Sequence, residues 1–185
     1  MHQISRLPSP VSSRRRVIAA VLLVVAAFAL QRAATGPWGT ATAADGAHLQ
    51  LTVSGLSRLS AGAVTDCRWW PAHGDATLCG PSALMSSYGR VKWAYPLLFV
   101  ALWASIGCLF LVFLNVPRAR WVRAVLTALT GTATLVAVLV MWRDAPQGLL
   151  VLQTATDRVL GLGAWLASVG TLSLWVSAGL QATET

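Results

Sequence analysis

Four long apolar runs, separated by polar or glycine-rich segments, dominate the pattern of the chain. They cover residues 17–34, 93–115, 122–142 and 159–181. A helix of about 20 apolar residues is long enough to cross the hydrocarbon core of a bilayer. The last three runs reach that length without a charge in their interiors. Each of these three therefore predicts a transmembrane helix.

The first run admits two interpretations. Its strictly apolar part, residues 17–30, is short for a span and follows Arg14, Arg15 and Arg16. A basic segment before a short apolar core is also typical of a secretory signal peptide, and residues 41–43 resemble a cleavage site. We favour an uncleaved helix, because the core is strongly apolar and the cleavage-like site lies well beyond its end. Under either interpretation the following segment lies outside the cytoplasm.

One long polar stretch, residues 35–92, lies between the first two runs. Within it Leu49, Leu51 and Val53 alternate with polar residues. Alternation with period two predicts a β-strand, and the glycines and prolines that follow predict turns. We therefore expect a small β-containing cap that cannot bury much of a core by itself.

Together these elements predict an all-α membrane bundle of four transmembrane helices, with a small disulfide-stapled, β-containing cap between the first two. The other segments are short: residues 1–16, 116–121, 143–158 and 182–185. Pro117 and Pro146 follow the second and third runs. Because proline interrupts helical hydrogen bonding, we expect both helices to end there, and the second and third to form a tight hairpin.

Composition agrees with a membrane protein. Of the 185 residues 56% are hydrophobic and only 11% are charged, whereas a soluble domain carries about a quarter charged residues. The formal net charge is +8. The arginines gather at the edges of apolar runs, where they report orientation, and form no basic face of the kind that binds nucleic acid. We expect the bilayer as a partner and no nucleic acid.

The distribution of arginine predicts the orientation. Residues 1–16 carry four arginines and residues 118–123 carry three, with no acidic residue in either segment. In residues 143–158 two arginines are balanced by two aspartates. Positively charged loops stay in the cytoplasm. We expect a plasma or inner membrane protein with both termini cytoplasmic and residues 35–92 extracytoplasmic.

The predicted spans contain few groups that could carry chemistry. They hold no Asp, Glu, Lys or His, and Arg123 lies one residue inside a span edge, where we expect its side chain to reach the interface. Ionisable groups within the membrane are typical of proton relays and ion paths. Their scarcity argues against a pump or a proton-coupled transporter, and we expect no cofactor.

Small residues recur on one face of the fourth run. They are Gly163, Ala167, Gly170 and Ser177. Such stripes let helix backbones approach closely in lipid. The stripe either packs inside the bundle or docks a partner helix. We favour internal packing, but the sequence leaves both alternatives open.

The cap contains two of the three cysteines. Cys67 and Cys79 have eleven residues between them, and Cys108 lies in the second run. An oxidising compartment favours a Cys67–Cys79 disulfide, which would stabilise the cap by about 3 kcal/mol in the chain-entropy model. Metal binding with His73 is the weaker alternative, because zinc-binding cysteines are usually closer in sequence. We expect no metal site.

Two adjacent tryptophans, Trp69 and Trp70, lie inside the predicted disulfide loop. One interpretation packs one ring under the bridge and the other against the bilayer. The other makes the pair an exposed anchor for a partner, since tryptophan is enriched in interface hot spots. Asp66, His73 and Asp75 are the candidate groups for catalysis at the membrane surface. No nucleophile motif accompanies them, so we expect no catalytic residue.

The layout of the chain includes Cys67, Cys79, the strand near residues 49–53 and Arg90 just before the second run. This layout resembles the claudin and peripheral-myelin-protein class of four-helix membrane proteins. The Gly-Leu-Trp of that class is missing, because Gly55 is followed by leucine and serine. The resemblance implies a first external loop with strands and one disulfide, and self-association into adhesive or barrier assemblies.

Three functional hypotheses follow. The first is a non-enzymatic accessory subunit that packs against other membrane proteins, or against itself, through helix faces and the cap. The second is the claudin-like self-associating protein. The third is a membrane enzyme or a lipid-handling protein. We favour the first, because the spans carry few ionisable groups and no catalytic motif is present.

Overall fold

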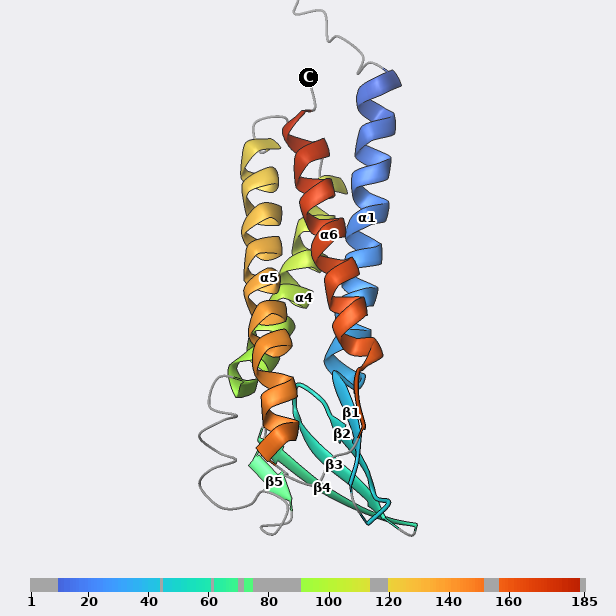
Figure 1. The fold of residues 1–185 in the computed structure, drawn as a ribbon. Coiled ribbons are helices and arrows are strands. Elements are labelled where there is room, and N and C mark those ends of the chain that lie inside the picture. Colours follow the sequence, from blue (N-terminus) through green and yellow to red (C-terminus); the bar gives the residue numbers. More distant parts are fainter. Residues whose placement is uncertain are drawn as a thin grey trace, which may run out of the picture.

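Four helices run side by side, and an antiparallel sheet covers one end of the bundle (Figure 1). The computed structural model describes residues 10–43, 45–60, 62–69, 72–74, 91–113, 120–151 and 157–183. The helices are α1 (Pro10–Thr35), α4 (Val91–Phe113), α5 (Arg120–Val151) and α6 (Leu162–Ala182). Each is long and apolar enough to cross a membrane. The predicted four-helix membrane bundle is therefore confirmed.

The ends of the helices differ from those expected. α1 begins at Pro10, so its arginines lie on the helix and its candidate span, Ser13–Thr35, has 23 residues. Pro96 lies inside α4, and α5 continues past Pro146 to Val151. The expectation that proline would end the third helix was wrong. A proline removes one backbone hydrogen bond and can bend a helix without ending it.

The helices pack as a square. α1 and α5 each contact both α4 and α6. The small-residue stripe of α6 lies inside this bundle: Gly163, Ala167, Gly170 and Ser177 are all buried. A Cβ added at Gly170 would lie 3.1 Å from the Leu30 side chain of α1. The Ser177 hydroxyl donates a 3.0 Å hydrogen bond to the Ala19 carbonyl oxygen. These four residues therefore pack inside the bundle, with Gly170 and Ser177 against α1.

The sheet has the strand order β5-β4-β3-β2-β1-β6. The strands are β1 (Gly39–Thr42), β2 (His48–Leu51), β3 (Gly55–Ser60), β4 (Ala63–Trp69), β5 (Ala72–Gly74) and β6 (Asp157–Leu160). The first five lie between α1 and α4, which confirms the predicted β-containing cap. In β2 the leucines are buried while His48 and Gln50 are exposed, as the alternation predicts.

The sixth strand was not expected. β6 precedes α6 and pairs antiparallel with β1, so that Gly39 lies opposite Leu160 and Thr42 opposite Asp157. The sequence pattern assigns residues 143–158 to a short connecting segment and residues 159–160 to the start of the fourth helix. Because β6 pairs with β1, the sheet contains strands from two connections, the one between α1 and α4 and the one between α5 and α6.

Arg123 does not reach the interface as expected. Its side chain is only 2% exposed, and Nη1 donates to the carbonyl oxygens of Leu111 at 3.3 Å and Val112 at 3.5 Å. These carbonyls lie in the last turn of α4, where main-chain oxygens lack partners within the helix and the helix dipole is negative. The end of the bundle can therefore hold the buried guanidinium group of Arg123.

Candidate functional site

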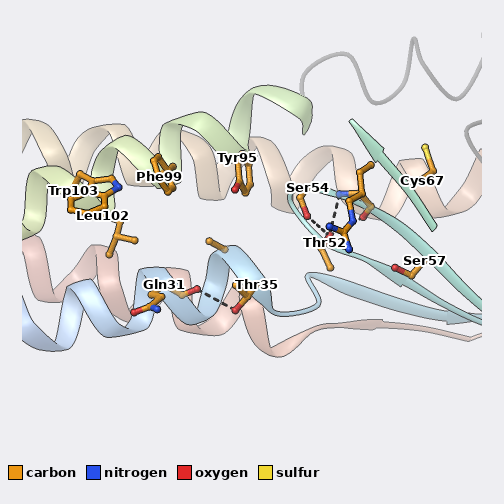
Figure 2. A pocket seen from close by; sticks show the side chains of 13 residues that line it. Gln31, Thr35, Thr52, Ser54, Ser57, Cys67, Tyr95, Phe99, Leu102 and Trp103 are labelled. Carbon is orange, nitrogen blue, oxygen red and sulfur yellow. Dashed lines mark hydrogen bonds between the residues drawn. The ribbon is translucent and has the colours of Figure 1, made fainter. Parts of the chain in front are cut away.

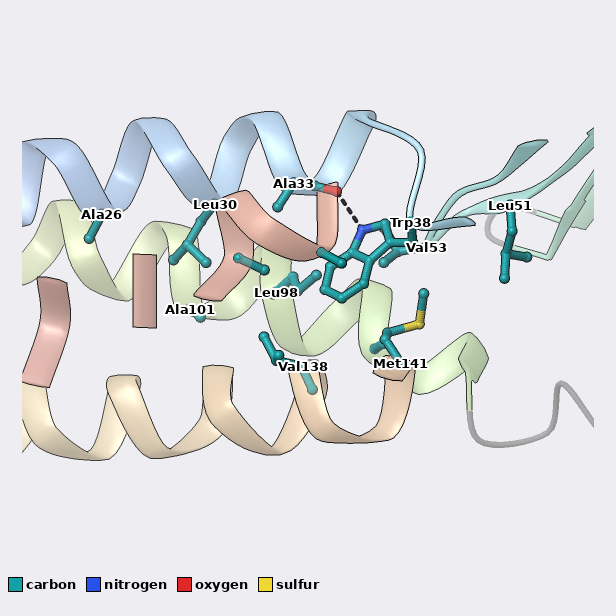
Figure 3. Packing of buried hydrophobic residues seen from close by; sticks show 14 of the residues in the cluster. Ala26, Leu30, Ala33, Trp38, Leu51, Val53, Leu98, Ala101, Val138 and Met141 are labelled. Atoms are coloured by element: carbon teal, nitrogen blue, oxygen red, sulfur yellow. Dashed lines mark hydrogen bonds between the residues drawn. The ribbon is translucent and has the colours of Figure 1, made fainter. Parts of the chain in front are cut away.

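The sheet is fixed to the bundle through Trp38. This residue is fully buried within one continuous hydrophobic cluster, which also includes Val53, Leu98 and Met141 (Figure 3). A Cβ added at Gly163 of α6 would lie 2.9 Å from Cδ1 of its indole ring. The indole ring of Trp38 therefore packs directly against the backbone of α6 at Gly163. The sheet and the helices share a single hydrophobic core.

Beside this junction, a cleft of about 540 Å³ lies between α1, α4 and the sheet (Figure 2). We refer to it as the sheet–helix cleft. Its wall on α4 is aromatic: Tyr95, Phe99 and Trp103 follow one another at a spacing of four residues. The Tyr95 and Phe99 rings stack with centroids 6.3 Å apart, and Trp103 meets Phe99 edge-on at 6.1 Å. Phe99 and Trp103 are exposed, so the cleft opens toward the surroundings of the bundle.

The opposite wall of the cleft is polar. Gln31 and Thr35 line it from the last turns of α1, and the Thr35 hydroxyl donates to the Gln31 carbonyl oxygen at 3.3 Å. These two side chains lie across the gap from the aromatic wall (Figure 2). In the sequence, Gln31 only follows an apolar run. Its place in the wall of a cleft becomes visible when α4 lies beside α1.

The sheet closes one end of the cleft with a tight turn. The Thr52 hydroxyl donates to the Gly55 carbonyl oxygen at 3.0 Å and accepts from the Gly55 N–H at 3.1 Å. A Cβ at Gly55 would lie 2.2 Å from the Cys67 carbonyl oxygen, so only glycine fits between β3 and β4 here. Ser57 and Arg68 complete this polar end.

The charged groups of the cap form two ion pairs among the described residues. In the cleft wall, Arg68 Nε lies 3.2 Å from Asp66 Oδ2. Elsewhere on the sheet, Arg58 pairs with Asp45. The backbone N–H of Ala47, which donates to Asp45, lowers the pKa of that carboxyl, and Arg58 lowers it further. The cleft therefore offers an exposed guanidinium group whose charge is partly balanced by its neighbour.

The cleft is apolar at one end, on α4, and polar at the other end, at the sheet. Trp103 lies ten residues along α4 from Trp93, which is about 15 Å along a helix and about half of the hydrocarbon thickness. The other end of the cleft reaches the sheet. A concave surface with an apolar wall and a few polar groups is typical of small-molecule sites. This one suits a molecule with a polar head and an apolar body.

The residues predicted as functional are distributed differently. Cys67 is buried on β4 and lines the cleft, whereas Cys79, Trp70 and Asp75 lie outside the described residues. Trp69 is the last residue of β4, and His73 pairs in register with Arg68. The described residues contain no group of three His, Cys, Asp or Glu side chains that could hold a metal ion.

The aromatic wall was missed by sequence reasoning. Its signal was present as the four-residue spacing of Tyr95, Phe99 and Trp103, which places three rings on one helix face. No protein-family model matches the chain, and no curated protein matches it.

Proposed function

We propose that this integral membrane protein binds an amphipathic component of the bilayer in the sheet–helix cleft. The observation that carries the proposal is the pairing of opposite walls: the aromatic rings of Phe99 and Trp103 on α4 face Gln31 and Thr35 on α1. This function belongs to the lipid-handling class, and it requires binding but no catalytic step.

The two walls would divide the ligand between them. The apolar body packs against the rings, which present large and rigid surfaces. The polar head accepts hydrogen bonds from hydroxyls such as those of Ser54 and Ser57, and from Arg68 at the sheet. Lipid tails are as apolar as the protein surface, so selectivity in a membrane comes from shape and polar contacts. The polar end of the cleft supplies such contacts.

We also propose the orientation that the arginines indicate, with both ends of the chain cytoplasmic. The sheet and the cleft would then lie at the extracytoplasmic leaflet. A Cys67–Cys79 disulfide belongs to the same proposal, because Cys67 lines the cleft from β4.

Photo-cross-linking tests the cleft. The protein would be reconstituted with phosphatidylethanolamine that carries a diazirine at the middle of one acyl chain. We expect cross-links to concentrate on residues 95–103 of α4, and to fall several-fold in a Phe99→Ala, Trp103→Ala double variant. Phe110→Ala is the matched control, because Phe110 is an exposed aromatic residue of the same helix away from the cleft. Equal labelling of the double variant and the control would contradict the proposal.

A second candidate function, the accessory subunit, is favoured by a groove of about 300 Å³ between α5 and α6. Trp121 and Trp175 flank it, and its floor consists of small residues: Ala124, Ala128, Ala178, Gly179 and Ala182. Small residues four apart on both helices let a further helix approach closely. A Cβ added at Gly179 would meet no atom within 4 Å, so the groove is open there.

The accessory role can be tested by purification in mild detergent. We expect a companion protein, or a second copy of this chain, to be retained by the unaltered protein and lost from Gly179→Leu. Gly107→Leu is the control, because Gly107 is equally open on α4. A solitary monomer in all three preparations would contradict this role. Ordered homo-oligomers in cross-linking would favour the claudin-like alternative.

A further inference from the structure

A second groove lies between α1 and α4, at the end of the bundle away from the sheet. It has a volume of about 550 Å³ and shares no lining residue with the sheet–helix cleft. We refer to it as the basic-end groove. Its walls are aliphatic and aromatic: Val17, Val21 and Val24 of α1, and Leu109, Val112 and Phe113 of α4.

The mouth of the basic-end groove is polar and cationic. Ser13 and Arg16, on the first turns of α1, line it together with the apolar walls. Neighbouring Arg15 points elsewhere, since its Nη1 donates a 2.7 Å hydrogen bond to the Thr183 carbonyl oxygen at the end of α6. Of residues 14–16, Arg16 is the one that lines the groove.

Among the described residues, the charged side chains at this end are all arginines. Arg14, Arg15 and Arg16 lie in one turn of α1, and Arg123 is buried between the ends of α4 and α5. In the described parts of the chain at this end, 10–30, 105–113, 120–130 and 170–183, the sequence contains no aspartate or glutamate. A site here favours an anion, and guanidinium groups bind phosphate oxygens in strong, charge-assisted hydrogen bonds.

We propose that the basic-end groove holds an acyl chain of an anionic phospholipid, whose phosphate contacts Arg16 and Ser13. This inference goes beyond the proposed function, because it concerns a different site, at the other leaflet, and selection by headgroup charge. The groove begins at a cationic mouth and continues along apolar side chains, which is the order of groups in such a lipid. Cytoplasmic leaflets are rich in anionic lipids that attract basic segments near the membrane.

A lipid chain suits the groove better than a partner helix. A helix with its side chains is about 10 Å wide and favours small residues where it packs, whereas the α1 wall of this groove consists largely of valine. Inorganic phosphate, the other possible source of the anion, would gain nothing from contact with the apolar walls. The proposal therefore commits to the intact lipid.

The test uses full-length, delipidated protein in detergent. Phosphatidylglycerol, phosphatidylcholine with the same acyl chains, and inorganic phosphate are added separately, and bound lipid is counted by native mass spectrometry. We expect phosphatidylglycerol to be retained in preference to phosphatidylcholine, and inorganic phosphate to have no effect. In Arg16→Gln the apparent affinity for phosphatidylglycerol should fall about tenfold, the size expected for one charge-assisted hydrogen bond. Arg14→Gln, an exposed neighbour, should keep the preference.

A second variant addresses the apolar part of the groove. Val21→Trp should fill it and reduce retention of phosphatidylglycerol, whereas Val176→Trp, at an exposed position of α6, should not. Equal retention of the two lipids, or an unchanged preference in Arg16→Gln, would overturn the proposal. Displacement of a co-purifying protein by Val21→Trp would also overturn it. The Phe99→Ala, Trp103→Ala variant should behave as the unaltered protein here, so failure at one site can be told from failure at the other.

Discussion

The indole nitrogen of Trp38 donates a 2.7 Å hydrogen bond to the main-chain carbonyl oxygen of Ala33. Four positions after Ala33 the chain has Pro37, which has no backbone N–H to complete the helical pattern. The side chain of Trp38 thus satisfies an acceptor that the backbone leaves open at the end of α1. The same ring joins the sheet to the bundle, so one contact ends a helix and positions the cap.

Trp38→Phe should destabilise the fold. The substitution keeps most of the apolar contact but leaves the buried Ala33 carbonyl oxygen without its donor, and an unsatisfied buried polar group costs about 1–3 kcal/mol. The free energy of unfolding in detergent, followed by circular dichroism, measures this. Trp93→Phe provides the comparison, because Trp93 is exposed and its replacement should change little. Similar losses in both variants would show that the hydrogen bond has no special role.

Gly163→Ala should lower stability through overpacking. The new Cβ would lie 2.9 Å from Trp38 Cδ1 and 3.0 Å from the Pro37 carbonyl oxygen. Forcing extra atoms into a packed core costs about 1–3 kcal/mol. Gly107→Ala is matched in chemistry but meets no atom within 4 Å. The thermal midpoints of the two variants should therefore move apart, with Gly107→Ala at or above the unaltered protein. A stable Gly163→Ala would mean that α6 can withdraw from Trp38.

The stability of the cap should fall in acid because of Asp45. Its pKa is lowered below the ordinary value of 3.8, first by the Ala47 N–H and then by Arg58. A carboxyl group with a lower pKa in the folded state stabilises the fold above its unfolded pKa, and loses this contribution as the pH falls through the folded value. We expect unfolding to become easier below about pH 4, as followed by tryptophan fluorescence.

Two variants separate the causes of this pH dependence. Asp45→Asn cannot titrate and should flatten the acid slope. Arg58→Gln removes only the ion pair and should give an intermediate slope, because the hydrogen bond from the Ala47 N–H still lowers the pKa of Asp45. An Asp45→Asn protein with the acid slope of the unaltered protein would exclude Asp45 as its source.

Thiol titration tests the Cys67–Cys79 bridge. Cys108 is a free thiol buried in α4. In denaturant without reductant we expect this single cysteine to react, and all three cysteines of the chain to react after reduction. Cys108→Ala should then show no reactive thiol before reduction. Three reactive thiols in unreduced, denatured protein would exclude the disulfide.

The apolar pattern predicted the helices well, since crossing a bilayer requires a long stretch of apolar side chains and satisfied backbone groups. It did not predict where α1 begins or where α5 ends. Pro146 lies within α5, because the loss of one hydrogen bond is small beside the packing of a whole helix. The alternation at Leu49 and Leu51 identified β2 for a similar local reason: one face of that strand is buried and the other is exposed.

The candidate site was less accessible to sequence reasoning. The spacing of Phe99 and Trp103 places both rings on one face of α4, but nothing local shows that Gln31 lies opposite them. β6 was missed because its partner, β1, is more than a hundred residues away in sequence, and a strand of four residues has too short a pattern to recognise. Distant partners of this kind are set by the topology of the chain.

Sequence pattern alone predicted a membrane protein, the three later helices, and the position of a cap with a strand, while it left two interpretations for the first apolar run. These properties depend on the solvent preference of consecutive residues. The burial of the Gly163–Ser177 stripe inside the bundle and of Arg123 at the end of α4 became visible in the three-dimensional arrangement. So did the sheet–helix cleft and the basic-end groove, which α1 and α4 both line. The surroundings of the small-residue stripe, of Arg123 and of the aromatic rings depend on the residues that pack against them, and those residues come from distant parts of the chain.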